Sequence, residues 1–256
     1  MKRTILKSFA GLLLSGLILS GCGAVPVTGR KQILLVSDQE IFQAGLVQYK
    51  EYLNGATVSS NASSTAMVKR VGSKLAAATE SYLRSVGLQS EISNFAWEFN
   101  LVKDTQVNAF CMPGGKIVVY EGLLTVAKTE EELAVVLGHE IAHAVAKHSN
   151  ERMSQEILAQ YGMSILSNVL SDKSAAVRNT ATTVFGLGAQ VGVMLPYSRK
   201  HEYEADYMGI VFMEMAGYDS QAAVTFWQSM SSLGSGSSVE LLSTHPSDAK
   251  RIANLQ

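Results

Sequence analysis

The sequence predicts an α+β fold, mostly helical, in which a small sheet and an edge-strand hairpin precede the helix that carries the main chemical motif. Three observations predict it: apolar residues alternate along residues 95–101, a Pro-Gly-Gly turn separates two short apolar runs, and helical periodicity continues from Thr129 almost to the end of the chain. The composition, 47% apolar and 17% charged over 256 residues, is that of a globular protein with one sizeable core.

The first 21 residues are expected to be a signal peptide for export. A basic start is followed by an apolar run over residues 8–20, and Leu-Ser-Gly then precedes Cys22. This pattern resembles the bacterial lipobox, so Cys22 is the predicted lipidation site and its lipid the expected membrane anchor. The alternative is an uncleaved membrane span, but the run is shorter than the ~20 residues that a span needs. Gly23 stands where an Asp would resemble an inner-membrane retention signal, which favours the outer membrane, facing the periplasm.

Residues 22–36 are expected to be a tether, and two packing helices follow it. Ser37 and Glu40 can form a capping box that opens the first helix. The second helix is indicated by apolar residues at spacings of three and four, namely Met67, Val71, Leu75, Ala78 and Tyr82.

The small sheet is expected between residues 95 and 120. Residues 95–101 alternate between apolar and polar or small side chains, which predicts a strand with one buried face. Two further runs, 106–110 and 116–120, flank residues 112–115, whose Pro and paired Gly are typical of a turn. The two runs therefore predict a hairpin.

Beyond Thr129 the chain is expected to be helical. Thr129 and Glu132 form a second possible capping box. Two apolar stretches, residues 157–170 and 181–195, fall short of the roughly eighteen uninterrupted apolar residues of a membrane span. We therefore expect core helices in both stretches.

The main chemical motif is His139-Glu140-Ile141-Ala142-His143, on the helix that Thr129 opens. Residues four apart project from one helix face, so both imidazoles can reach one Zn²⁺ at ~2.0–2.1 Å. Glu140 can act as the general base toward a water activated by that metal. The alternative is a chance match, but glutamate and histidine are costly on an otherwise apolar face unless they are paired or coordinated. We expect one zinc ion per chain.

A third protein ligand decides the class of zinc site, and two classes are excluded. A metzincin would have Gly and His where this chain has Ala146 and Ser149. His148, one position away, is expected to be a helix-end side chain and not a ligand. A thermolysin-like site would place a Glu soon after His143, and residues 157–201 contain none.

The next candidate ligand is Glu202. Asp206 shares its helix face one turn later and can accept the distal N–H of a zinc-bound histidine, which fixes the tautomer of that ring. The alternative for this stretch is a solvated, charged helix face.

These motifs resemble the family of CAAX prenyl protease, HtpX and Oma peptidases, which are zinc metallopeptidases of the gluzincin type, and in particular its LoiP-like envelope lipoprotein branch. By this resemblance Glu202 is the third zinc ligand. The hydrophobic spans of the prenyl-protease branch are missing, so cleavage of prenylated peptides is not implied. The elements that carry the likeness are residues 139–143, residues 198–206, His245-Pro246 with Arg251, residues 26–30, Asn108-Ala109-Phe110 and residues 113–115.

Catalysis needs a donor for the charge that grows on the carbonyl oxygen, and His245 is the candidate, with Arg251 orienting it. A neutral His245 is also a candidate fourth ligand in a resting state, and the plain alternative is a helix-start residue. An extended substrate can add to the predicted edge strand at Asn108, Ala109 and Phe110.

The sequence thus predicts one metallopeptidase domain over residues 37–256: a zinc-dependent endopeptidase, anchored as a lipoprotein in the bacterial envelope, that cleaves unfolded or exposed segments of envelope proteins in quality control. The alternative is a non-catalytic, metal-stabilised chaperone or assembly factor. Glu140 argues against it, because a structural zinc needs no base and normally closes its fourth position. A net charge of -1 excludes a nucleic-acid partner.

Overall fold

The computed structural model describes residues 22–189, 195–232, 240–245 and 249–255. The chain divides into two compact units, one made of residues up to Ser37 with Ser149–Pro196, the other of Asp38–His148 with Tyr197–Gln256. The predicted signal peptide lies outside the described residues. The single domain predicted over residues 37–256 stays a prediction.

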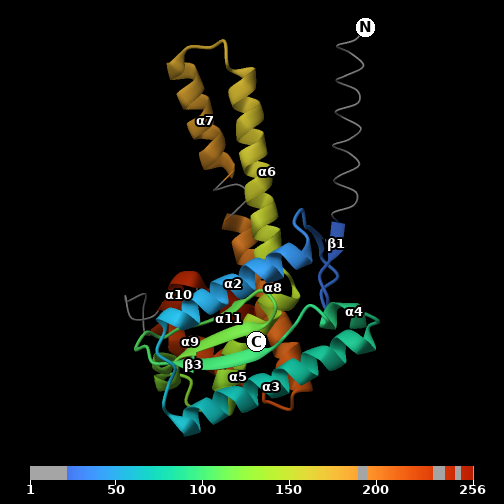
Figure 1. The fold of residues 1–256 in the computed structure, drawn as a ribbon, viewed down its shortest axis with the longest axis vertical. Helices are drawn as coiled ribbons and strands as arrows, with labels where there is room; N and C mark the ends of the chain where they lie inside the picture. Colours follow the sequence, from blue (N-terminus) through green and yellow to red (C-terminus); the bar gives the residue numbers. More distant parts are fainter. Residues whose placement is uncertain (1–21, 190–194, 233–239, 246–248, 256) are drawn as a thin grey trace. The chain divides into compact units, whose positions relative to one another are not determined.

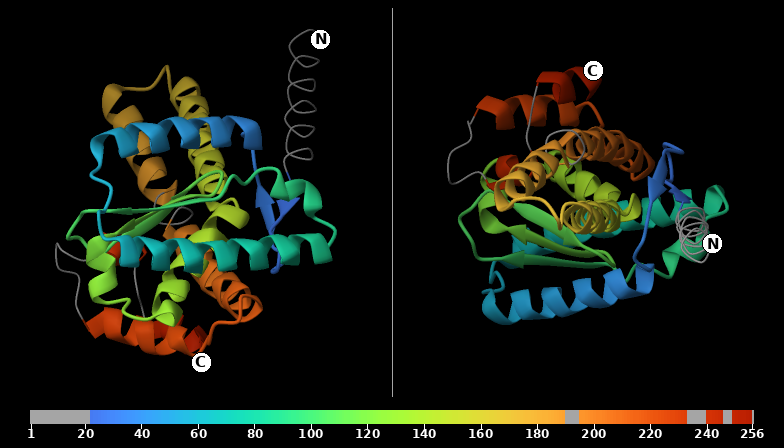
Figure 2. Two further views of the ribbon diagram at one scale, coloured as in Figure 1. Left: turned by 60° about the horizontal axis from the view of Figure 1, so that its bottom comes forward. Right: turned by 90° about the horizontal axis from the view of Figure 1, so that it is seen from above.

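The second unit is built on a three-stranded sheet of order β3-β5-β4 (Figures 1 and 2). Strand β3 (Glu98–Val102) runs parallel to β5 (Lys116–Tyr120), and β4 (Ala109–Met112) runs antiparallel to β5. The α+β class and the hairpin are confirmed, but β3 and β4 each begin three residues later than predicted. Before β4, the side chain of Asp104 accepts from the backbone N–H of Gln106, and this turn replaces the start of the strand.

Helices cover both faces of the sheet (Figure 2). On one face, α2 (Asp38–Gly55) packs Tyr49 against Val102 and Val118. On the other, α3 (Ala62–Ser85) and α5 (Glu130–Val145) contact the sheet and each other. The capping box of Thr129 and Glu132 opens α5 as predicted, with both of its hydrogen bonds present.

Short elements complete this unit. They are α4 (Gln89–Ile92), the 3₁₀ helix η1 (Glu121–Thr125), α9 (Ala222–Ser232), α10 (Glu240–Thr244) and α11 (Ala249–Leu255).

The long helix α8 (Leu195–Met215) runs beside α5. Two glycines set their distance: a Cβ added at Gly209 would lie 3.0 Å from the backbone nitrogen of His139 and 3.1 Å from the carbonyl carbon of Gly138. Only glycine allows α8 to approach the motif-bearing helix this closely.

The first unit holds a β-hairpin and two helices. Strands β1 (Cys22–Ala24) and β2 (Lys31–Ile33) pair antiparallel in the segment predicted to be a tether. Arg30 forms a two-pronged ion pair with the buried Glu151, at 2.7 and 2.8 Å, and so ties the hairpin to the base of α6 (His148–Val169).

Helix α6 and helix α7 (Ala175–Ala189) carry the described parts of the two apolar stretches for which core packing was expected, and for these residues that expectation is wrong. Residues 190–194 of the second stretch lie outside the described residues. Gly162 of α6 packs against Phe185 of α7, but Tyr161 is 65% exposed and Val169 70% exposed. Apolar composition alone does not reveal that two helices pair with each other and leave their outer faces uncovered. Among the described residues, no helix is both long and apolar enough to span a membrane.

Candidate metal centre

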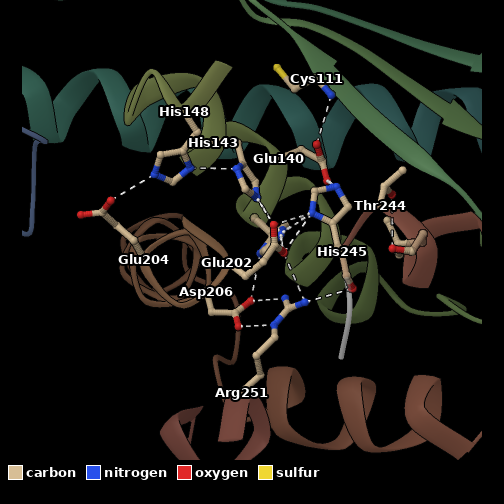
Figure 3. Close-up of polar contacts among 12 residues, drawn as sticks. Cys111, Glu140, His143, His148, Glu202, Glu204, Asp206, Thr244, His245 and Arg251 are labelled. Atoms are coloured by element: carbon tan, nitrogen blue, oxygen red, sulfur yellow. Dashed lines mark hydrogen bonds and ion pairs between the residues drawn. The ribbon is translucent and has the colours of Figure 1, made fainter. Parts of the chain in front are cut away.

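The motif residues lie on α5, buried against α8 (Figure 3). His139 and His143 are one turn apart and project from the same face, because four residues make about one turn of an α-helix. The close approach at Gly209 brings Glu202 and Asp206 of α8 next to them. Residues separated by 59 to 67 positions in the sequence thus meet through one helix–helix contact.

Four potential ligands converge at one point. The group of His139, His143, Glu202 and His245 offers one ligand atom each, and all of these atoms lie within 4.8 Å of one another. The two histidine Nε2 atoms are 3.0 Å apart, and Glu202 oxygens lie 3.2 Å from Nε2 of His139 and 3.4 Å from that of His143. Tetrahedral ligands at ~2.0–2.1 Å from zinc stand roughly 3.3–3.4 Å apart. The spacing and the two-imidazole, one-carboxylate donor set therefore fit Zn²⁺.

The far side of His139 is held by a buried ion pair. Nδ1 of His139 donates to Asp206 Oδ1 at 2.9 Å, which turns Nε2 toward the ligand group. Arg251 of α11 grips Asp206 through Nε at 2.7 Å and Nη2 at 2.6 Å, and its Nη1 lies 3.3 Å from Glu202. The guanidinium stacks over Trp227 with its carbon 4.2 Å from the ring centroid.

The charges of these groups influence one another strongly. Burial lowers the pKa of His143, as suits a neutral imidazole ligand. Burial also acts to lower the pKa of His139, but its hydrogen bonds to Asp206 and Glu202 outweigh burial and raise that pKa to about 9. Burial works against ionised Glu202, yet hydrogen bonds from three histidines keep its pKa far below the ordinary range. The centre therefore holds Glu202 as an ionised carboxylate that can balance the charge of a bound cation.

Glu140 lies beside the ligand group and is held by a separate hydrogen bond. The backbone N–H of Cys111 in β4 donates to Glu140 Oε2 at 3.1 Å, and Glu140 Oε1 lies 3.3 Å from Nε2 of His245. Glu140 is 3% exposed. It faces the space next to the ligand group without belonging to that group.

His245 sits directly after α10 and faces both the ligands and Glu140 (Figure 3). Its Nδ1 is 3.1 Å from Nε2 of His139 and 3.0 Å from Glu202 Oε2, while its backbone oxygen accepts from Arg251 Nη1 at 3.2 Å. Residues 233–239 and Pro246 lie outside the described residues. The two roles predicted for His245, oxyanion donor and latent ligand, stay predictions.

The predicted substrate residues are at the start of β4. Ala109 and Phe110 open the strand, and Asn108 is buried just before it. The ring of Phe110 packs edge-on against Tyr52, 5.2 Å between centroids, on the face of the sheet opposite Cys111 and α5. Only the backbone of Phe110 is therefore placed to meet a substrate at this edge.

Sequence reasoning missed two residues next to the centre, His148 and Glu204. His148 does not end a helix, as expected, but begins α6; its ring contacts His143 on one side and Glu204 on the other. It is not part of the ligand group found among the described residues. The spacing of His148 five residues after His143, and of Glu204 two after Glu202, was the available signal.

Comparison with known proteins agrees with the motifs. The family described as peptidase family M48 matches residues 63–256. The chain is 39% identical over 163 residues to mitochondrial metalloendopeptidase OMA1 of Arabidopsis thaliana, covering 63% of this chain and 31% of the relative. It is 30% identical over 262 residues to the human OMA1 metalloendopeptidase, covering 98% and 48%. With the beta-barrel assembly-enhancing protease of Escherichia coli it shares 29% identity over 185 residues, covering 68% and 37%. The chain thus spans half or less of the length of these relatives.

Proposed function

The chain belongs to peptidase family M48, and from this premise we propose that it is a zinc-dependent endopeptidase that cleaves unfolded or exposed segments of proteins in a bacterial envelope. The observation that carries the proposal is the convergence of His139, His143 and Glu202 with Glu140 beside them, at 3.0 to 3.4 Å between ligand atoms. Bound there, zinc would polarise a peptide carbonyl and make water acidic enough to attack at neutral pH.

Within this mechanism, Glu140 handles protons. Its carboxylate takes a proton from the attacking water and delivers it to the nitrogen of the leaving amine. The hydrogen bond from the Cys111 N–H holds Oε2, which leaves Oε1 as the atom that exchanges the proton. His245 Nε2 lies 3.3 Å from Oε1 and can donate to the charge that grows on the carbonyl oxygen.

The substrate is proposed to bind as an extended strand along β4. In the described part of the chain, β4 pairs with β5 on one edge only, and the N–H of Cys111 lies on the other edge, beside Glu140. A strand added at this edge would bring one of its carbonyls to the metal centre. A folded helix hides its carbonyls in internal hydrogen bonds, which is why unfolded or exposed segments are the proposed substrates.

Attachment to the membrane by a lipid on Cys22, and an outer-membrane position facing the periplasm, belong to the same proposal. They are supported by the Leu-Ser-Gly-Cys pattern and by Gly23 after it. A protease held at the membrane surface meets envelope proteins before they are folded, which fits a role in quality control.

The test compares the wild type with Glu140→Gln in zinc content and in cleavage of unfolded casein. We expect about one zinc per chain in both proteins, and a loss of ~10²–10⁴ in turnover for the variant because its amide cannot take a proton. Removing zinc from the wild type with a chelator should abolish cleavage, and adding zinc should restore it. Wild-type turnover by Glu140→Gln would contradict the mechanism; zinc-bound but inactive wild type would favour the chaperone alternative.

A further inference from the structure

We propose that His148 and Glu204 form a hydrogen-bonded chain that orients His143 and determines which of its ring nitrogens carries the proton. This inference rests on the proposed zinc site and gives both residues a positioning role. Neither residue belongs to the ligand group, and neither has a part in the mechanism described above.

The geometry begins at the ligand group and runs outward (Figure 3). His143 directs Nε2 toward Nε2 of His139, at 3.0 Å, and Nδ1 toward Nδ1 of His148, at 2.8 Å. On the other side of its ring, Nε2 of His148 lies 3.0 Å from Glu204 Oε2. The three side chains form a continuous line that starts at the candidate metal position and ends on a carboxylate.

Only one arrangement of protons along this line lets His143 bind a metal. An ionised carboxylate only accepts hydrogen bonds, so Nε2 of His148 must donate to Glu204. In a neutral His148 the other nitrogen, Nδ1, is then an acceptor, and His143 must donate to it from its own Nδ1. The lone pair of His143 is thereby left on Nε2, the atom that faces the ligand group.

The same logic operates at His139 through a direct contact, and helix α8 explains the difference. Asp206 lies one turn after Glu202, on the same face of α8, and reaches Nδ1 of His139 itself. Glu204, two residues after Glu202, projects from another face of the helix. A second imidazole is therefore needed to connect it with His143.

Both members of the chain are held firmly. His148 is 2% exposed and Glu204 7% exposed, and the ring of His148 stacks on that of His201 with centroids 4.1 Å apart. Just before His148, Lys147 has a left-handed backbone with φ of 57°, and ion pairs to Asp38 at 2.6 Å and Glu91 at 2.7 Å stabilise it. This turn between α5 and α6 brings His148 back toward His143.

The experiment measures zinc affinity of the full chain by competition with a chromophoric chelator, and the His143 ring by ¹⁵N NMR of the zinc-loaded protein. His148→Phe keeps a ring that can stack but has no acceptor, and we expect it to bind zinc ~10–100-fold more weakly. His148→Asn offers an amide oxygen near the position of Nδ1, so it should recover part of the loss. Glu204→Gln should show a smaller loss, together with a shifted His143 Nδ1–H resonance.

Glu151→Gln is the matched control. It removes an equally buried carboxylate charge, the partner of Arg30, without touching the chain of hydrogen bonds, and should leave zinc affinity and the His143 resonance unchanged. Zinc affinity within twofold of wild type in both folded His148→Phe and folded Glu204→Gln, with an unchanged His143 resonance, would overturn the inference while the proposed function stands. A wild type that binds no zinc would overturn both.

Discussion

At the scale of single residues, Arg251 links the two carboxylates of the centre. It is 1% exposed, holds Asp206 with two hydrogen bonds and lies 3.3 Å from Glu202. A planar guanidinium can contact both carboxylates at once through several N–H groups. An ammonium is a compact charge and cannot reproduce the pair of hydrogen bonds to Asp206. The orientation of His139 and the position of Glu202 therefore depend on the same side chain.

We expect Arg251→Lys to keep the charge but weaken zinc binding by ~10–100-fold, because Asp206 would no longer be fixed against His139. Chelator competition measures this directly. Arg70→Lys is the control: Nε and Nη2 of Arg70 both donate to Glu130 Oε1 at the surface, where the loss of these two hydrogen bonds costs little. Equal zinc affinity in Arg251→Lys and wild type would show that the fork has no part in the centre.

His245→Ala distinguishes the two roles proposed for this histidine, because they predict opposite changes in the rate of cleavage. A latent-ligand role, which the 3.1 Å between Nδ1 of His245 and Nε2 of His139 supports, predicts that the variant binds zinc more weakly and, when saturated with zinc, cleaves casein faster. Steady-state kinetics at fixed free zinc provide the measurement. A fall of ~10²–10³ in kcat with unchanged zinc affinity would instead assign it as an oxyanion donor only. If neither quantity changes, both roles are wrong.

At the scale of elements, the contact between α5 and α8 decides whether the site forms. Gly209→Ala would place a methyl group 3.0 Å from the backbone nitrogen of His139, where no flexible side chain can move aside. We expect a loss of ~1–3 kcal/mol in unfolding free energy, measured by urea denaturation, and weaker zinc binding because Glu202 shifts away from the histidines. Gly55→Ala, near the end of α2, meets nothing within 4 Å and should be neutral or slightly stabilising. A Gly209→Ala protein as stable and as metal-avid as wild type would show that the helices have room to separate.

How far sequence leads to structure differs between elements. The start of α5 and the turn after β4 were predicted correctly. The capping box of Thr129 and Glu132 and the turn at the paired glycines both depend only on residues that are neighbours in the sequence. The predicted start of β4 was wrong because the side chain of Asp104 accepts a hydrogen bond from the backbone N–H of Gln106 and so forms a turn before the strand. The prediction that the apolar stretches of α6 and α7 lie in a core was wrong, because the exposure of a helix face depends on which other element packs against it. The contacts of His148 were not predicted because one of its partners, Glu204, is 56 residues away in the sequence.

At the scale of the whole molecule, two features bear on the proposed attachment to a membrane. Cys22 opens β1, and the same compact unit contains α6 and α7, whose outer faces leave Tyr161 and Val169 exposed. The Arg30–Glu151 ion pair fixes the hairpin of β1 and β2 to the base of α6. Attachment through the lipid and attachment through the helices predict different results.

We expect Cys22→Ser to release the protein from membranes in carbonate extraction and to leave zinc binding and casein cleavage unchanged, since the centre lies in the other unit. The comparison variant is Tyr161→Asn with Val169→Asn, which makes the helices more polar and leaves Cys22 in place. Release by the helix variant together with retention of Cys22→Ser would contradict lipid anchoring and assign the attachment to α6.

The long separation between the parts of the metal centre has a consequence for biosynthesis. His139 and His245 are 106 residues apart, and Asp206 and Arg251 are 45 residues apart. During translation or export, α5 is therefore complete long before Glu202 and Arg251 have emerged. A growing chain carries the two histidines and Glu140 but lacks the carboxylate that closes the centre and the guanidinium that steadies it. On the proposed mechanism, a growing chain therefore has an incomplete metal centre and no proteolytic activity until Glu202, Asp206 and Arg251 have been added and have folded onto α5.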